Sequence, residues 1–387
     1  MASRLMAGWR ERWVGWVGGM AVLLVVGYIG WFFYLLWTHF GGAIFGDPYT
    51  YLSFATNLAR GDFLVKGALG EAVREFFADG ELRLGPIWNT NVMPDGRTVF
   101  TVAIGFPLML SQIIRWFGLA CCMHANFLFL ALCFLLVVWV GYEAFGRDRA
   151  ALWIGLLGLL FFIATRTELF MRIAYLWREP FFFSLVLGGL VGVGHFLRTG
   201  RVVGLMTAAF LLGYAGSVKE ANFLYGGAAA LCVLFSRPFR EHAHRGRLLV
   251  LCGVCGFLGV LPLFVQNYLA TGNPLLSMQF ARATAHYSLE EAGAGLSTGN
   301  TRETLRRYVL LYRDNPFFAW PFWGLFAVGV LRVRRRPLAG LLLVFGLMHF
   351  ALYSQWGNAD YRHMFFAHIP FALFVAAGFI GLAQGVG

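Results

Sequence analysis

Residues 124–165 read HANFLFLALCFLLVVWVGYEAFGRDRAALWIGLLGLLFFIAT, and this stretch decides the fold. It contains two apolar runs, at 124–145 and 150–165. A helix crosses a bilayer with roughly 20 apolar residues, and with fewer where the bilayer thins. The segment GRDR at 146–149 separates the runs and is long enough only for a turn. The stretch therefore predicts two membrane spans joined by a short, arginine-rich loop.

The rest of the chain repeats this pattern. Of its 387 residues, 59% are hydrophobic and 13% are charged, whereas soluble globular proteins carry about 25% charged residues. This composition excludes a water-soluble enzyme. We predict an all-α, polytopic membrane protein in a single transmembrane domain, 1–387, with no soluble C-terminal domain. Ten spans are expected, at about 14–37, 124–145, 150–165, 180–197, 202–218, 221–235, 248–268, 317–331, 338–352 and 364–382.

The positive charges orient these spans. If the N-terminus is cytoplasmic, the cytoplasmic segments are 1–13, 146–149, 198–201, 236–247 and 332–337. These 39 residues hold 15 of the 31 Lys and Arg residues, as the positive-inside rule expects. An integral protein of the inner or plasma membrane is predicted, with both termini cytoplasmic. Because the net charge of +12 reports this topology, no nucleic-acid partner is expected.

Segment 101–117 is long enough to be a short span, but a crossing there would put every later arginine-rich loop outside. Its polar residues share one helical face, which favours a helix lying on the outer membrane surface. These residues are Ser111, Gln112 and Arg115.

Segment 49–60 has the same character, and its polar residues are Ser53, Asn57 and Arg60. The first outer loop, about 38–123, is therefore expected to carry helices that lie on the membrane. A second long loop covers about 269–316. Most connecting sequence lies on this face, which predicts that the protein works there.

Sequence motifs of soluble catalysis are absent: there is no Walker loop, no dinucleotide-binding glycine pattern, no HExxH and no GxSxG. Ionisable residues near the outer membrane surface are then the candidates for function. Asp47 and Glu179 each precede a proline at a predicted helix start, so each suits either a helix cap or a catalytic carboxylate. Glu168 is a weaker alternative to Glu179.

Two cations stand at the outer ends of spans. Lys219 is followed by Glu220, and the pair suits either an anion site or an ion pair that reaches the membrane surface. Arg362 opens the last span, with Asp360 and His363 beside it. Its guanidinium suits either a phosphate clamp or an ordinary membrane anchor.

The order of these features resembles the GT-C polyprenyl-phosphate-sugar glycosyltransferases, which include the protein O-mannosyltransferases and the aminoarabinose transferases of lipid A. Where that family often carries a second acid, this chain has Pro48. The segments that carry the resemblance are DPYTYLSFATNLARGD at 47–62, GFPL at 105–108, FGR at 145–147, SVKE at 217–220 and RHMFFAHIP at 362–370.

The resemblance implies transfer of a sugar from a polyprenyl-phosphate donor to an acceptor hydroxyl or amine on the outer face. It makes Asp47 and Glu179 the catalytic residues, and Lys219 and Arg362 the ligands of the donor phosphate. It implies no protein metal site and no required cofactor, and leaves a divalent cation open. Membrane lipids are partners in this interpretation. Further substrate contacts are expected from Tyr51, Glu220, Asp360 and His363.

Two other classes of function are compatible with the sequence. A transporter or lipid flippase would carry charged or helix-breaking residues at mid-span, whereas here the charges gather at the ends of spans. A non-catalytic GT-C-like subunit would keep the fold without the chemistry, and Pro48 leaves this alternative open.

Overall fold

The computed structural model describes most of the helical part of the chain. The described residues are 47–63, 90–92, 98–100, 102–165, 176–220, 223–276, 301–313, 315, 318–333, 336–354 and 361–385, with scattered positions between 20 and 34. The first predicted span, 14–37, lies outside them except at those scattered positions. Asp360 and Glu168 also lie outside the described residues.

Nearly every described element is a helix, which confirms the all-α prediction. One short antiparallel pair of strands, β1 (Thr90–Val92) and β2 (Thr98–Phe100), departs from it. The helices are α2 (Asp47–Ala59), α4 (Gly105–Met123), α5 (Ala125–Phe145), α6 (Arg149–Ala164), α8 (Glu179–Thr199), α9 (Val202–Val218), α10 (Phe223–Leu234), α11 (Arg237–Arg240), α12 (Arg245–Thr271), α15 (Thr301–Arg313), α16 (Trp320–Val333), α17 (Pro337–Ser354) and α18 (Tyr361–Gly385).

Six of these helices are long and apolar enough to cross a membrane, namely α4, α5, α8, α12, α17 and α18. Helices α6, α9, α10 and α16 are apolar but shorter, at 10–17 residues. Large apolar side chains point outward from the bundle, such as Leu128 at 73% exposure and Val250 at 66%. In water such surfaces are costly, but lipid tails cover them without penalty. The helices therefore support an integral membrane protein, although ten separate spans are not confirmed.

The α5–α6 hairpin forms where the sequence predicts it. Its turn needs left-handed backbone, with φ of 137° at Gly146 and 62° at Arg147. Asp148 then caps α6, accepting a hydrogen bond from Ala151 N at 2.7 Å. The two helices pack so closely that a Cβ added to Gly141 would lie 2.6 Å from Cα of Gly155. Small residues thus let the backbones approach, as in other membrane helix pairs.

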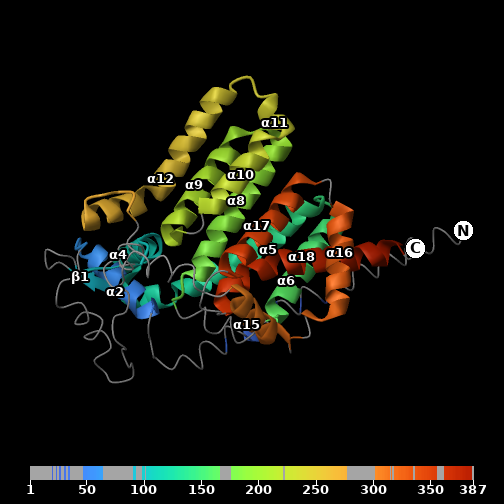
Figure 1. The fold of residues 1–387 in the computed structure, drawn as a ribbon, viewed down its shortest axis with the longest axis horizontal. Helices are drawn as coiled ribbons and strands as arrows, with labels where there is room; N and C mark the ends of the chain where they lie inside the picture. The colour runs from blue at the N-terminus through green and yellow to red at the C-terminus, as the bar shows by residue number, and fades with distance from the viewer. Residues whose placement is uncertain are drawn as a thin grey trace, which may run out of the picture.

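Helix α8 joins two groups of helices. Figure 1 shows α9 and α12 on one side of it and α5, α6, α16 and α18 on the other, while α10 packs on both α9 and α17. On the first side, Gly213 of α9 lies against Gly256 of α12. On the second, Gly329 of α16 lies against Phe374 of α18. Each group is therefore held by close backbone approach at glycine.

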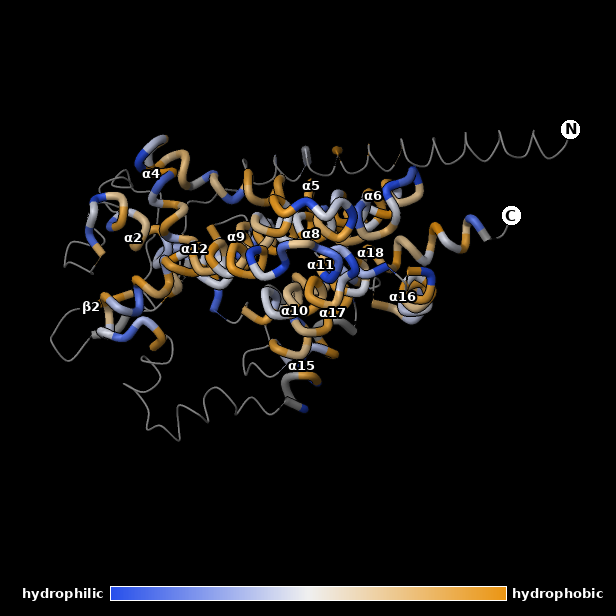
Figure 2. Tube along the Cα trace, turned by 90° about the horizontal axis from the view of Figure 1, so that it is seen from above, coloured by the Kyte–Doolittle hydropathy of each residue, from blue (hydrophilic) through white to orange (hydrophobic). Residues whose placement is uncertain are grey.

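The arginine-rich connections meet at one end of the bundle. Arg198, at the end of α8, lies 3.8 Å from Glu143 of α5. The Arg336 guanidinium lies against Gly146, about 2.9 Å from where a Cβ would stand. The short helix α11 packs on α8. Figure 2 shows hydrophilic residues around α11 and the neighbouring turns, between helices that are largely hydrophobic.

At the other end lie α2, α4 and the strand pair, which Figure 1 shows beyond the ends of α9 and α12. Their polar residues do not form one continuous water-facing stripe: Arg60 and Arg115 are exposed, but three of the others are buried. Ser53 and Ser111 are buried at 0% and 1% exposure, and Asn57 is buried as well. Arg115 donates hydrogen bonds to the Leu58 and Ala59 carbonyls at 2.8 and 3.0 Å. Arg115 thus joins α4 to the end of α2. Helical spacing predicts which residues share a face but does not show what that face contacts.

Helix α4 bends at Gly118, where φ is 81°. Its straight first part, 105–117, is about 20 Å long at ~1.5 Å per residue. The hydrocarbon core of a bilayer is about 30 Å thick. The bend is therefore consistent with a helix at the membrane surface, even though the whole helix is long enough to span.

Candidate functional site

Three helix ends meet at the end of the bundle opposite the arginine-rich connections. Arg178, just before α8, donates a hydrogen bond to the Val218 carbonyl at the end of α9, at 3.4 Å. Its guanidinium carbon lies 5.8 Å from the centroid of the Tyr51 ring on α2. Because Glu179 and Lys219 follow these contacts directly in the chain, the backbones of both residues belong to the same junction.

Close packing fixes this junction. A Cβ on Gly105 would lie 2.6 Å from the Ser217 carbonyl carbon, so the start of α4 rests directly on the end of α9. Tyr214 of α9 donates a hydrogen bond to the Gly105 carbonyl at 2.9 Å. Ser217 in turn donates to the Gly259 carbonyl of α12 at 2.9 Å. Together these contacts hold α4, α9 and α12 in one arrangement.

Gln266 of α12 holds the segment that leads into α4. Its amide oxygen accepts from Ile104 N at 2.8 Å, and its amide nitrogen donates to the Val102 carbonyl at 2.8 Å. The side chain is 1% exposed, so these bonds satisfy polar groups that water does not reach. A single residue, distant in sequence, thus fixes where α4 begins.

Aromatic rings pack together where α2, α4 and α8 begin. Tyr51 meets Phe106 edge-on, with ring centroids 5.4 Å apart. Phe106 in turn lies 5.9 Å from Phe181, in the first turn of α8. These ring contacts hold the first turns of α2, α4 and α8 against one another.

Glu179 is buried in the first turn of α8 at 3% exposure. Its Oε2 atom has no hydrogen-bond partner among the described residues. The helix N-terminus favours a carboxylate there, although Arg178 is the N-cap residue and no side chain makes a capping hydrogen bond. A buried carboxylate oxygen without a partner nevertheless costs free energy. The position therefore offers an acceptor to a hydrogen-bond donor of a bound molecule.

Lys219 ends α9 and is 9% exposed. Its ammonium lies 4.3 Å from the centroid of the Tyr353 ring on α17. Tyr353 stacks beside His349 at 4.6 Å, and His349 Nδ1 is hydrogen-bonded to the Tyr225 hydroxyl. The ammonium is thus seated on α17 inside the protein, where the charge can act on a bound group with little screening by water.

The remaining predicted residues are placed by their backbones alone. Asp47 begins α2 one turn before Tyr51, and residues four apart share a helix face. Arg362 is the second residue of α18, and Met364 packs in a cluster with Tyr353 and Tyr308. The side chains of Asp47, Arg362 and His363 lie outside the described residues.

The structure accordingly brings Tyr51, Arg178 and the backbones of Glu179 and Lys219 to one junction, and Glu220, the next residue in the chain, is half-buried. Sequence reasoning treated Arg178 only as a partner for Glu179, and it missed Tyr353 altogether. The four-residue spacing of His349 and Tyr353 was the available signal, because it puts two polar aromatic residues on one face of an apolar helix.

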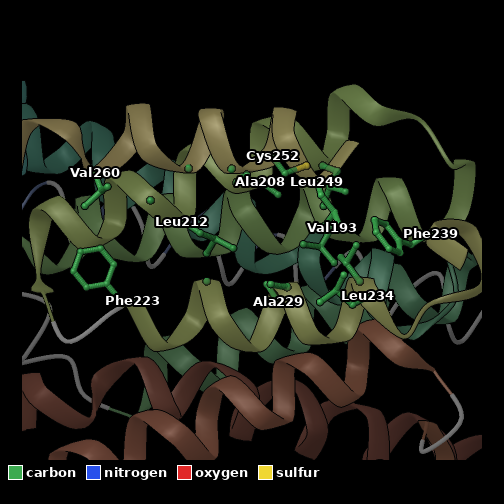
Figure 3. Close-up of a pocket in the computed structure, with 18 of the residues that line it drawn as sticks. Val193, Ala208, Leu212, Phe223, Ala229, Leu234, Phe239, Leu249, Cys252 and Val260 are labelled. Atoms are coloured by element: carbon green, nitrogen blue, oxygen red, sulfur yellow. The ribbon is translucent and has the colours of Figure 1, made fainter. Parts of the chain in front are cut away.

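An apolar groove leads to this junction between α8, α9, α10 and α12. Its volume is about 530 Å³, and no charged side chain lines it. Figure 3 shows Phe223 and Val260 near one end and Leu234 and Phe239 near the other. Phe223 lies against Gly216, one turn before Lys219. A groove lined only by apolar residues suits an apolar ligand.

Among the described residues, no three His, Cys, Asp or Glu side chains gather as a metal site. Comparison with protein-family models, with curated proteins and with solved structures found no match to this chain.

Proposed function

We propose that the protein is a membrane glycosyltransferase with a GT-C-like fold. It moves a sugar from a polyprenyl-phosphate donor to an acceptor hydroxyl or amine on the outer face of the membrane. One observation carries the proposal: buried Glu179 and Lys219 belong to the junction where Arg178 bonds to the end of α9, and an apolar groove lies between α8, α9, α10 and α12. Ionisable groups at such depth are costly, and membrane proteins retain them mainly where they bind or react.

In this proposal the polyprenyl chain lies in the groove and its phosphate lies at Lys219. The acceptor oxygen attacks the anomeric carbon of the sugar while the bond from that carbon to the lipid phosphate oxygen breaks. The phosphate leaves as an anion and keeps the bonding electron pair. Lys219 and Arg362 stabilise the charge that develops on it, which is most effective in a site with little water.

The acceptor proton goes to a carboxylate. We assign this role to Asp47, at the start of α2, where it acts as general base toward a hydroxyl. Glu179 Oε2 is assigned to the acceptor, because a buried oxygen without a partner gains most from a hydroxyl or ammonium donor. Tyr51, Glu220, Asp360 and His363 are assigned to the walls of the same site.

Transfer is tested in membranes of the native host, which supply acceptors, with a panel of polyprenyl-phosphate-linked hexoses and pentoses. The readout is covalent product and released polyprenyl phosphate. D47N is expected to lose transfer while its expression and thermal stability match wild type. The control is E241Q, because Glu241 is exposed and pairs with Arg237 at the opposite end. Near-normal transfer by D47N would remove Asp47 from the mechanism.

The same donors test the transporter alternative in liposomes. Movement of the donor across the bilayer without covalent product, together with no transfer in host membranes, would replace the enzyme by a flippase. The absence of both activities, and of lipid-phosphate binding, would favour a non-catalytic subunit.

A further inference from the structure

The arginine-rich end of the bundle contains a second, separate pocket of about 220 Å³. It lies where the α5–α6, α8–α9 and α16–α17 connections meet, far along the spans from Lys219. Its lining residues include Glu143, Arg147, Arg198, Arg336 and Leu338.

One carboxylate and three guanidinium groups line this pocket, and the carboxylate pairs with two of them. The Glu143 side chain is 4% exposed, and its Oε1 atom pairs with Arg147 at 3.1 Å. Its Oε2 atom lies 3.8 Å from Arg198, a loose pair. With Arg336, the pocket carries one negative and three positive charges. The surplus of two positive charges is uncompensated by the protein residues that line it.

Of the three arginines in this pocket, Arg336 is the one that pairs with no carboxylate among the described residues. Its guanidinium is held against Gly146, but no hydrogen bond or ion pair joins it to another described residue. It directly precedes α17, an 18-residue helix whose first amide groups point toward the pocket end. An arginine beside a helix N-terminus is a favourable arrangement for a phosphate.

We propose that this pocket binds the phosphate of an anionic phospholipid in the adjacent leaflet. The pocket stands at the ends of apolar helices long enough to span, where lipid headgroups lie. Leu197 and Leu338 share its lining, so a lipid glycerol backbone finds apolar contacts beside the charges. A leaflet that carries anionic lipid attracts such basic positions. The site is independent of the sugar-transfer proposal.

The purified protein is reconstituted in nanodiscs of phosphatidylcholine, with or without phosphatidylglycerol. Thermal unfolding and retained lipid, by native mass spectrometry, are measured. Phosphatidylglycerol is expected to raise the unfolding temperature of the wild type. R336Q is expected to retain about fivefold less of it, the effect of one cation at a membrane surface. R336Q leaves the Glu143 pairs in place, and R237Q is the matched control, because Arg237 is an exposed arginine at the same end.

Inorganic phosphate added to phosphatidylcholine nanodiscs distinguishes a soluble anion from a lipid. A rise in unfolding temperature with phosphate alone, equal to that with phosphatidylglycerol, would overturn the lipid proposal. Equal loss of lipid in R336Q and R237Q would overturn it as well. If R336Q does not fold, wild-type protein is crosslinked with phosphatidylglycerol carrying a headgroup photoprobe. Labelling at 143–147 or 336–338 supports the site, and labelling elsewhere refutes it.

Discussion

Replacing Lys219 with methionine is expected to weaken the binding of undecaprenyl phosphate by about thirtyfold. A hydrogen bond to a charged group contributes about 2 kcal/mol, which corresponds to roughly thirtyfold in affinity. Lys219 is only 9% exposed, so little water reaches this position. Solvent therefore cannot make up for the interaction that the phosphate loses with the ammonium. The proposed role therefore predicts a loss well above experimental error.

The effect on stability is expected to be small. The ammonium gains about 2 kcal/mol from a desolvated aromatic ring such as Tyr353. Removing a buried charge, however, recovers several kcal/mol of desolvation penalty. Because the two effects oppose each other, K219M should unfold close to the wild-type temperature. A loss of lipid binding in K219M would therefore not result from a loss of folded protein.

The assay is native mass spectrometry of the protein in detergent, titrated with undecaprenyl phosphate. K219R, which keeps the positive charge, should retain most of the affinity, and E241Q at the far end should bind as wild type does. Wild-type affinity in K219M, with folding intact, would show that Lys219 does not meet the phosphate. Equal loss in K219R and K219M would mean that shape rather than charge matters there.

Three further predictions follow from the packing and from the buried carboxylate. E179Q should fold as wild type does but lose transfer activity, whereas unchanged transfer would leave Glu179 as a helix cap only. G259A should unfold about 1–3 kcal/mol more easily in denaturant titrations, because its Cβ would lie 2.7 Å from Tyr214 N. The matched change G253A meets nothing within 4 Å and should be neutral or gain up to about 1 kcal/mol; similar values for both would refute the close-packing argument. Q266L should lose about 1–3 kcal/mol of unfolding free energy for each backbone group left unpaired. A protease should also cleave it faster than wild type just before α4. Resistance equal to wild type would contradict the anchoring role of Gln266.

Much of the architecture was predictable because the relevant signals are local. Apolar length marks most of the helices, and the Gly-Arg-Asp-Arg segment predicted the turn between α5 and α6; the left-handed positions and the Asp148 cap come from the structure. The interpretation of α2 and α4 failed in one respect, since Ser53, Asn57 and Ser111 are buried. They lie where α2 packs on α4 and neighbouring segments, and periodicity does not identify what covers a helix face.

The candidate site was predictable in part. Glu179 and Lys219 were chosen because each is a charge at the end of an apolar run, a position that sequence alone can recognise. Arg178 and Tyr353 were not predicted for the site, because the sequence offers Arg178 only as an ion-pair partner of Glu179 and does not single out Tyr353. Their roles come from contacts that join α8 to α9 and α17 to α9.

The chain's composition and apolar periodicity determined that it enters a membrane as a set of helices with arginine between them, because the cost of burying charge in lipid acts on every residue separately. Tertiary packing alone decided that the starts of α2, α4 and α8 meet the end of α9, and that a groove opens beside that junction. Those contacts join residues separated by tens to more than a hundred positions. Their geometry depends on which glycines allow backbones to touch, and this property belongs to pairs of helices rather than to either sequence.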